Sequence, residues 1–182
     1  SASEIEQAME LGLDFVKFFP AEQAGGLPYI KAVCAPYSQM RFMPTGGVSE
    51  DNLNTYLSYN KIVCCGGSWI VPSKLLESGD WAGITKLCRT AVDKMLGFEM
   101  VHVGLNCADA DEAEAVADEF NAAFGFEKKV GNSSVFSHTY MEMMKKPFHG
   151  THGHIAIATN SVKRALYQLE KRGYKVMEGS QK

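Results

Sequence analysis

Short apolar runs that alternate with amphipathic stretches are the feature of residues 1–96 that most limits how the chain can fold. Three runs have strand character and end near glycine or proline: 14–19 (DFVKFF), 39–48 (QMRFMPTGGV) and 61–69 (KIVCCGGSW). Stretches with helical periodicity follow them, at 27–37, 50–60 and about 80–96. Apolar strands that alternate with helices indicate a parallel sheet covered on both faces. From the residues alone we expect an α/β layer with three parallel strands.

The pattern changes at Gly97. Residues 98–107 alternate as a strand, and 109–125 have the period of an acidic amphipathic helix. Three short strands are expected next, at 126–131, 133–138 and 139–144. The sequence then restarts its pattern, as an expected strand at 152–159, a helix at 160–173 and a strand at 174–179. This order predicts a βαβββ unit followed by the first part of a second, and two domains, 1–97 and 98–182.

Capping residues predict where several helices begin and end. For a first helix within 1–12, Ser3 can cap, Glu6 can close a capping box and Gly12 can end the helix in the left-handed conformation. Ser49 is the expected cap of the helix at 50–60. Because the first helix starts at once and no methionine precedes it, we expect this sequence to be part of a longer protein.

Charge and cysteine content argue against several classes of function. The net charge of -3 gives no basic surface for nucleic acid. No apolar run reaches the roughly 20 residues of a membrane span, and no signal-peptide pattern opens the sequence. The five cysteines form no CxxC pair, which is typical of a protein in the reducing cytoplasm. We therefore expect a cytoplasmic protein that acts on neither nucleic acid nor membranes.

Lys17 is unusual because it stands within an apolar run. One interpretation is structural: the stem packs and the ammonium reaches solvent at the strand end. The other is chemical: a lysine in apolar surroundings can serve as an amine nucleophile, since those surroundings disfavour its charged form. The neighbouring Phe15, Phe18 and Phe19 would provide such surroundings.

Two glycine pairs follow the second and third expected strands. Gly46 and Gly47 stand in PTGG, and Gly66 and Gly67 stand in GGSW. A single pair is usually a tight turn, but backbone N–H groups of such loops also bind phosphate, because glycine permits close approach. Two pairs at successive strand ends, downstream of Lys17, favour a phosphate-binding site.

The segments FVKFFPAE, RFMPTGGV and VCCGGSWIVP, at these separations, closely resemble the aldolase family that cleaves 2-keto-3-deoxy-6-phosphogluconate (KDPG) and 4-hydroxy-2-oxoglutarate (KHG). The resemblance covers residues 1 to about 96. It implies a homotrimeric (β/α)8 barrel, with these strands as the sixth, seventh and eighth. It also implies a small keto-acid substrate and no cofactor.

The resemblance implies a role for each matched residue. Lys17 would form the imine with pyruvate, and Phe19 and Thr45 would line the pocket. The phosphate-binding loops would comprise Gly46, Gly47, Gly67 and Ser68. In the family, the acid/base glutamate and a carboxylate-binding arginine lie on an earlier strand that nothing in this sequence matches, so we expect the chain alone to be nearly inactive. Glu22 lies past the strand end and is not assigned the missing role.

Residues 98–182 resemble the vicinal oxygen chelate superfamily, which includes glyoxalases and ring-cleaving dioxygenases. HVGLNC and GHIAIAT are similar to the opening strands of its two modules, and YMEMM to the strand that closes the first. The resemblance implies a divalent metal (zinc, nickel or manganese) on His102, Glu142 and His154, with a fourth ligand on a strand beyond Lys182. The other three histidines, at 138, 149 and 152, do not match.

The predicted fold is therefore the last three βα units of a barrel, followed by an incomplete α+β βαβββ-repeat domain. The predicted function is that of a Schiff-base aldolase fused to a glyoxalase-like domain. Two alternatives stay open. The first half can bind phosphorylated sugars without chemistry, and the second half can be a separate metal enzyme or a non-catalytic binding module.

Overall fold

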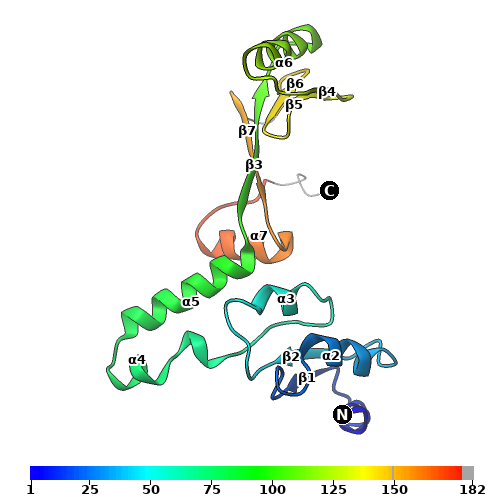
Figure 1. Cartoon of the computed structure of the whole chain (residues 1–182), viewed down its shortest axis with the longest axis vertical. Helices are drawn as coiled ribbons and strands as arrows, with labels where there is room; N and C mark the ends of the chain where they lie inside the picture. The colour runs from blue at the N-terminus through cyan, green and yellow to red at the C-terminus, as the bar shows by residue number, and fades with distance from the viewer. Residues whose placement is uncertain (149, 178–182) are drawn as a thin grey trace. The chain divides into compact units, whose positions relative to one another are not determined.

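The computed structural model describes residues 1–148 and 150–177, and the chain divides into two compact units, Ser1–Leu96 and Gly97–Lys182 (Figure 1). The first unit contains two strands, β1 (Phe15–Phe18) and β2 (Arg41–Pro44). Its helical segments are α1 (Ala2–Glu10), α2 (Gly26–Cys34), α3 (Leu53–Leu57), the 3-10 turn η1 (Ser68–Ile70), α4 (Ser73–Glu77) and α5 (Trp81–Leu96).

The strands β1 and β2 are parallel, as the alternation of apolar runs and helices predicts. Their register pairs Phe15 with Arg41 and Phe18 with Pro44. The third strand expected at 61–69 does not form. This segment meets β2 only at two isolated bridges, Phe42 with Ile62 and Thr45 with Gly66.

The spacing of those two bridges explains the missing strand. Ile62 and Gly66 are four residues apart, whereas their partners Phe42 and Thr45 are three apart. The segment therefore carries one extra residue, as in a β-bulge, and the regular ladder is interrupted. Hydrogen bonds still connect it to β2 on either side of the interruption, from Phe42 N to Lys61 O (2.8 Å) and from Gly66 N to Pro44 O (3.1 Å).

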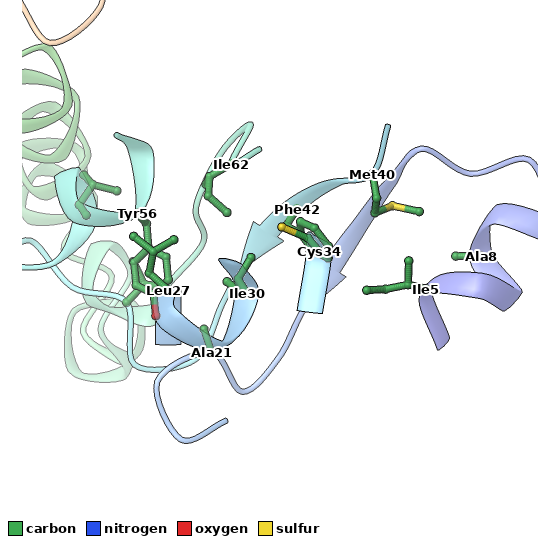
Figure 2. Packing of buried hydrophobic residues seen from close by; sticks show 12 residues of the cluster. Ile5, Ala8, Ala21, Leu27, Ile30, Cys34, Met40, Phe42, Tyr56 and Ile62 are labelled. Carbon is green, nitrogen blue, oxygen red and sulfur yellow. The ribbon is translucent and has the colours of Figure 1, made fainter. Parts of the chain in front are cut away.

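The core of the first unit lies between its helices and β2 (Figure 2). Helix α2 contributes Leu27, Ile30 and Cys34, spaced three and four residues apart on one face. Phe42 of β2 and Tyr56 of α3 are each only 1% exposed. Burying apolar side chains of this size stabilises a fold by about 1.5–3 kcal/mol each, so this cluster holds the short elements of the unit together.

Two helix starts differ from the expected ones. Helix α1 has Ser1 at its N-cap, and Glu4 accepts a hydrogen bond from the Ser1 hydroxyl (2.7 Å), so the capping box predicted at Ser3 and Glu6 is wrong. Helix α3 is preceded by Asn52 rather than Ser49, because the Asn52 side chain accepts from the Ser49 N–H (2.8 Å) and keeps the intervening residues in a turn. The left-handed conformation predicted for Gly12 is confirmed (φ 77°).

The long helix expected at about 80–96 is confirmed as α5. The apolar face that its periodicity predicts is half-buried along most of the helix, and Leu96 at its end is fully buried. This face comprises Trp81, Ile84, Leu87, Cys88, Ala91, Val92 and Met95. Trp81 is the exception on that face, because it is 64% exposed at the first turn.

The second unit is a five-stranded sheet with two helices, α6 (Ala110–Phe124) and α7 (Val162–Lys171). Its strands are β3 (Glu99–Asn106), β4 (Lys128–Val130), β5 (Ser134–Ser137), β6 (Met141–Met144) and β7 (Gly153–Ala158). The order in the sheet is β4-β5-β6-β3-β7. β3 is parallel to β6 and antiparallel to β7.

This topology confirms the predicted βαβββ unit and the strand and helix that follow it. The strand expected at 174–179 is not found: residues 174–177 are not in a strand, and residues 178 and 179 lie outside the described residues. Within residues 1–148 and 150–177, no helix combines the length and the apolar character needed to cross a membrane.

Helix α6 covers one face of the second sheet. Its Ala113 and Ala117 are fully buried in a cluster with Val135 and Met143, and Met141 packs against this cluster. Successive residues of a strand point to opposite faces, so Glu142 of β6 projects to the face away from α6. That second face carries the charged side chains described below.

The cap of α6 gives a direct test of this unit. The Asp109 carboxylate accepts from the Glu112 N–H at 2.9 Å, so Asp109→Ala should lower the free energy of unfolding by about 1 kcal/mol. Asp109→Asn is the matched control, because its amide oxygen accepts the same bond and should retain most of the stability. Urea unfolding of both variants measures the effect, and an equal loss in both would contradict a capping role.

Candidate functional sites

Lys17 lies in the middle of β1, opposite Met43 of β2. It is exposed, as the structural interpretation given above expects, and it is not enclosed by apolar side chains. The reason is the strand pleat: Val16 and Phe18 turn toward the core and are partly buried, whereas Phe15 and Lys17 turn to the other face. The sequence predicted a sheet covered on both faces, whereas in the structure only one face of β1 is covered.

The surroundings of Lys17 are nevertheless partly apolar. Its Nζ atom lies 5.1 Å from the centroid of the Phe19 ring, a cation–π distance. Both residues line a cavity of about 300 Å³, together with Glu4 and Ile5 of α1. The same cavity is lined by Val16, Phe18 and Phe42 of the core face, so Lys17 borders it from the other face of β1.

The first glycine pair follows directly on β2. Thr45 donates its N–H to Phe18 O at 2.9 Å, which fixes the start of this loop against the end of β1. The Thr45 hydroxyl is buried and has no hydrogen-bond partner among the described residues. Gly46 and Gly47 both have positive φ, 89° and 79°, a conformation that favours glycine.

A side chain from the segment that follows β1 lies close to each glycine of this pair. A Cβ on Gly46 would stand 2.9 Å from the Phe19 ring, and one on Gly47 would stand 2.6 Å from Glu22 Cβ. Gly46 therefore adjoins the side chain that contacts Lys17. Lys17, Phe19 and the Thr45–Gly47 loop form one continuous group.

The second glycine pair lies beside the first, because Gly66 bridges to Thr45. A Cβ on Gly67 would collide with the Trp69 ring and would stand 2.8 Å from Val48 O. Ser68 begins the η1 turn immediately afterwards. The structure thus brings Gly67 and Ser68 to the same edge of the strand pair as Gly46 and Gly47.

Glu22 lies beyond the end of β1, as its position in the sequence indicates, and its side chain has a specific partner. The Tyr56 hydroxyl donates to Glu22 Oε1. Burial, and then this hydrogen bond, raise the pKa of the Tyr56 phenol. Sequence reasoning missed this contact because its members are 34 residues apart.

A second group of candidate side chains lies in the other unit. His102 from β3, Glu142 from β6 and His154 from β7 bring one ligand atom each to within 4.8 Å of one another. Glu142 Oε2 is 3.1 Å from His102 Nε2 and 3.2 Å from His154 Nε2. The two imidazoles are also in contact, with 3.1 Å between their Nε2 atoms.

Gly104 explains how these side chains meet. It lies in register with Glu142 on one side and with His154 on the other, at the centre of three adjacent strands. A Cβ on Gly104 would collide with the His154 imidazole. The missing side chain lets His154 cross over β3 toward Glu142.

Ser134 and Phe136 of β5 complete the surroundings of this cluster. Ser134 is 5% exposed and donates its hydroxyl to Glu142 Oε1 at 2.6 Å, which leaves Oε2 for the imidazoles. The Phe136 ring meets His102 edge-on, with 5.6 Å between centroids. Neither residue was singled out from the sequence, although the short turn between β5 and β6 places them opposite β6.

The remaining histidines differ from this pair. His138 stacks on Tyr140, with 4.6 Å between ring centroids, and is exposed. His152 contributes a backbone oxygen that accepts from Asn106 N, and residue 149 lies outside the described residues.

The cluster of His102, Glu142 and His154 offers two imidazole nitrogens and one carboxylate oxygen, largely shielded from solvent. This donor set suits a divalent first-row metal.

Comparisons with known proteins concern the first unit. Residues 1–87 match the family described as KDPG and KHG aldolase. The 2-dehydro-3-deoxy-phosphogluconate aldolase of Haemophilus influenzae is 49% identical over 89 residues, which are 49% of this chain and 42% of that protein. The KHG/KDPG aldolase of Escherichia coli K12 is 48% identical over 93 residues, 51% of this chain and 44% of that protein.

A solved structure of the KDPG aldolase of Legionella pneumophila, with pyruvate captured as a covalent carbinolamine intermediate, is 41% identical and has a TM-score of 0.48. The alignment covers 50% of this chain and 44% of that one. The chain therefore spans less than half the length of the curated relatives named above.

The role of Gly104 can be tested by adding one carbon. Gly104→Ala should force the His154 ring away from Glu142, because the new Cβ occupies the position of the imidazole, and should cost about 1–3 kcal/mol of unfolding free energy. Nuclear Overhauser contacts between the His102 and His154 rings would report the displacement. Gly125→Ala is the control: its positive φ (69°) makes the substitution unfavourable, but nothing lies within 4 Å of the new Cβ, so the rings should not move. Unchanged contacts between the rings in Gly104→Ala would contradict this explanation.

Proposed function

We propose that the first unit belongs to an imine-forming aldolase that cleaves KDPG, KHG or both to pyruvate and an aldehyde. The observation that carries the proposal is the match of residues 1–87 to this family, with Lys17 and Phe19 lining one cavity beside the glycine loops. On the same resemblance, we place β1, β2 and the segment 61–66 as the sixth, seventh and eighth strands of a (β/α)8 barrel. We likewise propose a homotrimer in the cytoplasm.

The proposed chemistry begins at the amine of Lys17. The neutral amine attacks the ketone at the second carbon of the substrate, and loss of water leaves an iminium ion. The iminium accepts the electron pair of the bond between the third and fourth carbons, while the hydroxyl on the fourth carbon gives its proton to the acid/base group that the preceding strand would supply. The bond breaks to release an aldehyde and leave an enamine. Protonation of the enamine at the third carbon and hydrolysis of the imine then free pyruvate and restore the amine.

The proposed roles of the remaining residues follow from their positions. Phe19 and Thr45 would bound the keto-acid end of the substrate; the unpartnered Thr45 hydroxyl is available to hold a polar group there. With KDPG the aldehyde carries a phosphate, which the loops at Gly46, Gly47, Gly67 and Ser68 would hold. Gly46 and Gly47 both have positive φ, and loops of this conformation can turn backbone N–H groups toward an anion.

Trapping of the imine tests the nucleophile. In a chimera that joins residues 1–96 to the preceding part of the E. coli relative, borohydride and pyruvate should leave an adduct on Lys17. Lys17→Ala should lower cleavage by more than about 10³-fold. Lys17→Arg should not restore activity, because guanidinium stays protonated.

Lys31→Arg is the matched control for this experiment. The Lys31 ammonium lies 5.4 Å from the centroid of the Tyr59 ring, a cation–π contact like that of Lys17 with Phe19. Its substitution should leave cleavage and trapping unchanged. An adduct on Lys31, or on any other lysine, would remove the central assignment.

For the second unit we propose a divalent metal site on His102, Glu142 and His154 in a glyoxalase-like domain. The supporting observation is the convergence of the three ligand atoms, with Ser134 fixing the orientation of the carboxylate. A metal bound there would act as a Lewis acid toward an oxygen ligand of the substrate. The alternative is a non-catalytic binding module with the same sheet.

Calorimetric titration of the full chain with zinc, nickel or manganese separates these alternatives. We expect weak binding that is lost in acid, because protons compete with the metal for imidazole. His154→Ala should abolish binding, and Ser134→Ala should weaken it about 10–100-fold. His138→Ala is the control, since its ring lies against Tyr140. Absence of binding, or binding unchanged by His154→Ala, would favour the non-catalytic module.

A further inference from the structure

The hydrogen bond between Tyr56 and Glu22 has no part in the chemistry proposed above, yet burying the Tyr56 hydroxyl costs desolvation free energy. Tyr56 is 1% exposed and stands within the core of the first unit (Figure 2). Its hydroxyl donates to Glu22 Oε1. A buried hydroxyl needs a partner, but many partners would serve, so the choice of a carboxylate next to a glycine loop calls for an explanation.

The backbone of Glu22 and its neighbour holds the loop that follows β2. Ala21 N donates to Thr45 O at 2.8 Å, and Glu22 N donates to Gly46 O at 3.1 Å. The stem of the Glu22 side chain lies directly over Gly47. Glu22 therefore touches this loop through its main chain and through its side chain.

Two further features lead from helix α3 to the same loop. Asn52, which precedes α3, donates its Nδ2 to Gly47 O at 3.0 Å. Gly26 leaves room for the Tyr56–Glu22 bond, because a Cβ there would stand 3.3 Å from both Glu22 Oε1 and the Tyr56 hydroxyl. The region of α3 thus holds the loop on one side through Asn52 and on the other through Tyr56 and Glu22.

We propose that Tyr56 is a positioning residue which, through Glu22, holds the Thr45–Gly47 loop in the conformation that binds the anionic end of the substrate. The inference rests on the proposed function of this loop. It adds a specific cause for the loop's geometry. Without the bond, the Glu22 stem is no longer held over Gly47. The N–H groups of residues 21 and 22 then hold Thr45 O and Gly46 O less firmly.

The test uses the full chain labelled with ¹⁵N and two measurements. Hydrogen exchange of the Ala21 and Glu22 amides reports how firmly the loop is held, and titration with inorganic phosphate, followed at the Gly46 and Gly47 amides, reports binding. Tyr56→Phe and Glu22→Ala should raise the two exchange rates about tenfold and the phosphate dissociation constant about three- to tenfold. Glu22→Gln should largely restore both, because its amide oxygen still accepts from Tyr56.

Tyr59→Phe is the matched control. Its hydroxyl contacts Cys34 Sγ at 3.1 Å in the same unit and has no contact with the loop, so its loss should leave both measurements unchanged. Exchange rates unchanged in Tyr56→Phe would overturn the inference, as would faster exchange with unchanged phosphate affinity, which is the result of a merely structural bond. A wild-type chain that shows no phosphate response would instead overturn the phosphate loop itself, and the inference with it.

Discussion

The parallel register of β1 with β2 is the constraint on which the first site depends. Because the strands run the same way and Phe18 pairs with Pro44, both strands end at one edge, and the residues that follow them become neighbours. Phe19 and Gly46 meet there, and Thr45 extends the pairing through its bond to Phe18 O. A slip of one residue would turn Lys17 to the core face, and Val16 and Phe18 to the exposed one.

The second site depends in the same way on β3, which lies between β6 and β7. A bulge between Met100 and His102 shifts the register of β3 against β7. Met100 is consequently paired with Ile157, on the face away from His154, whereas His102 shares the face of Gly104. Bulges of this kind re-aim side chains in functional sheets. One irregularity thus separates the histidine face from the apolar face of the same strand.

The sequence predicted the elements of both units well where local signals are strong. The βαβββ order, the long helix α5 and the parallel pairing of β1 with β2 follow from periodicity and glycine positions. The prediction of a third strand was wrong because the one extra residue between Ile62 and Gly66 cannot be recognised within an apolar run. The exposure of Lys17 could not be decided from the sequence, because such a run does not indicate whether one face of a strand or both are covered.

Side-chain contacts between different elements were out of reach for a different reason. Ser134 and Tyr56 are ordinary residues in sequence, and their importance comes from the carboxylates that the fold brings to them. The three metal-ligand candidates could be named from a resemblance, but the position of His154 over β3 depends on Gly104 through the register of three strands. Register is a property of the assembled sheet, so no local pattern carries it.

Both sites use glycine for the same physical purpose. In each, a residue without a side chain stands where a candidate side chain from a neighbouring segment crosses: Gly46 under the Phe19 ring and Gly104 under the His154 imidazole. A glycine inside a strand, like Gly104, weakens the strand by roughly 0.5–1 kcal/mol relative to alanine, because it loses more conformational freedom on folding. Here alanine would cost more, since its Cβ would displace the ring above it. Packing, rather than intrinsic propensity, therefore decides whether replacing such a glycine by alanine raises or lowers the stability of the fold. These glycines consequently mark the positions where side chains converge.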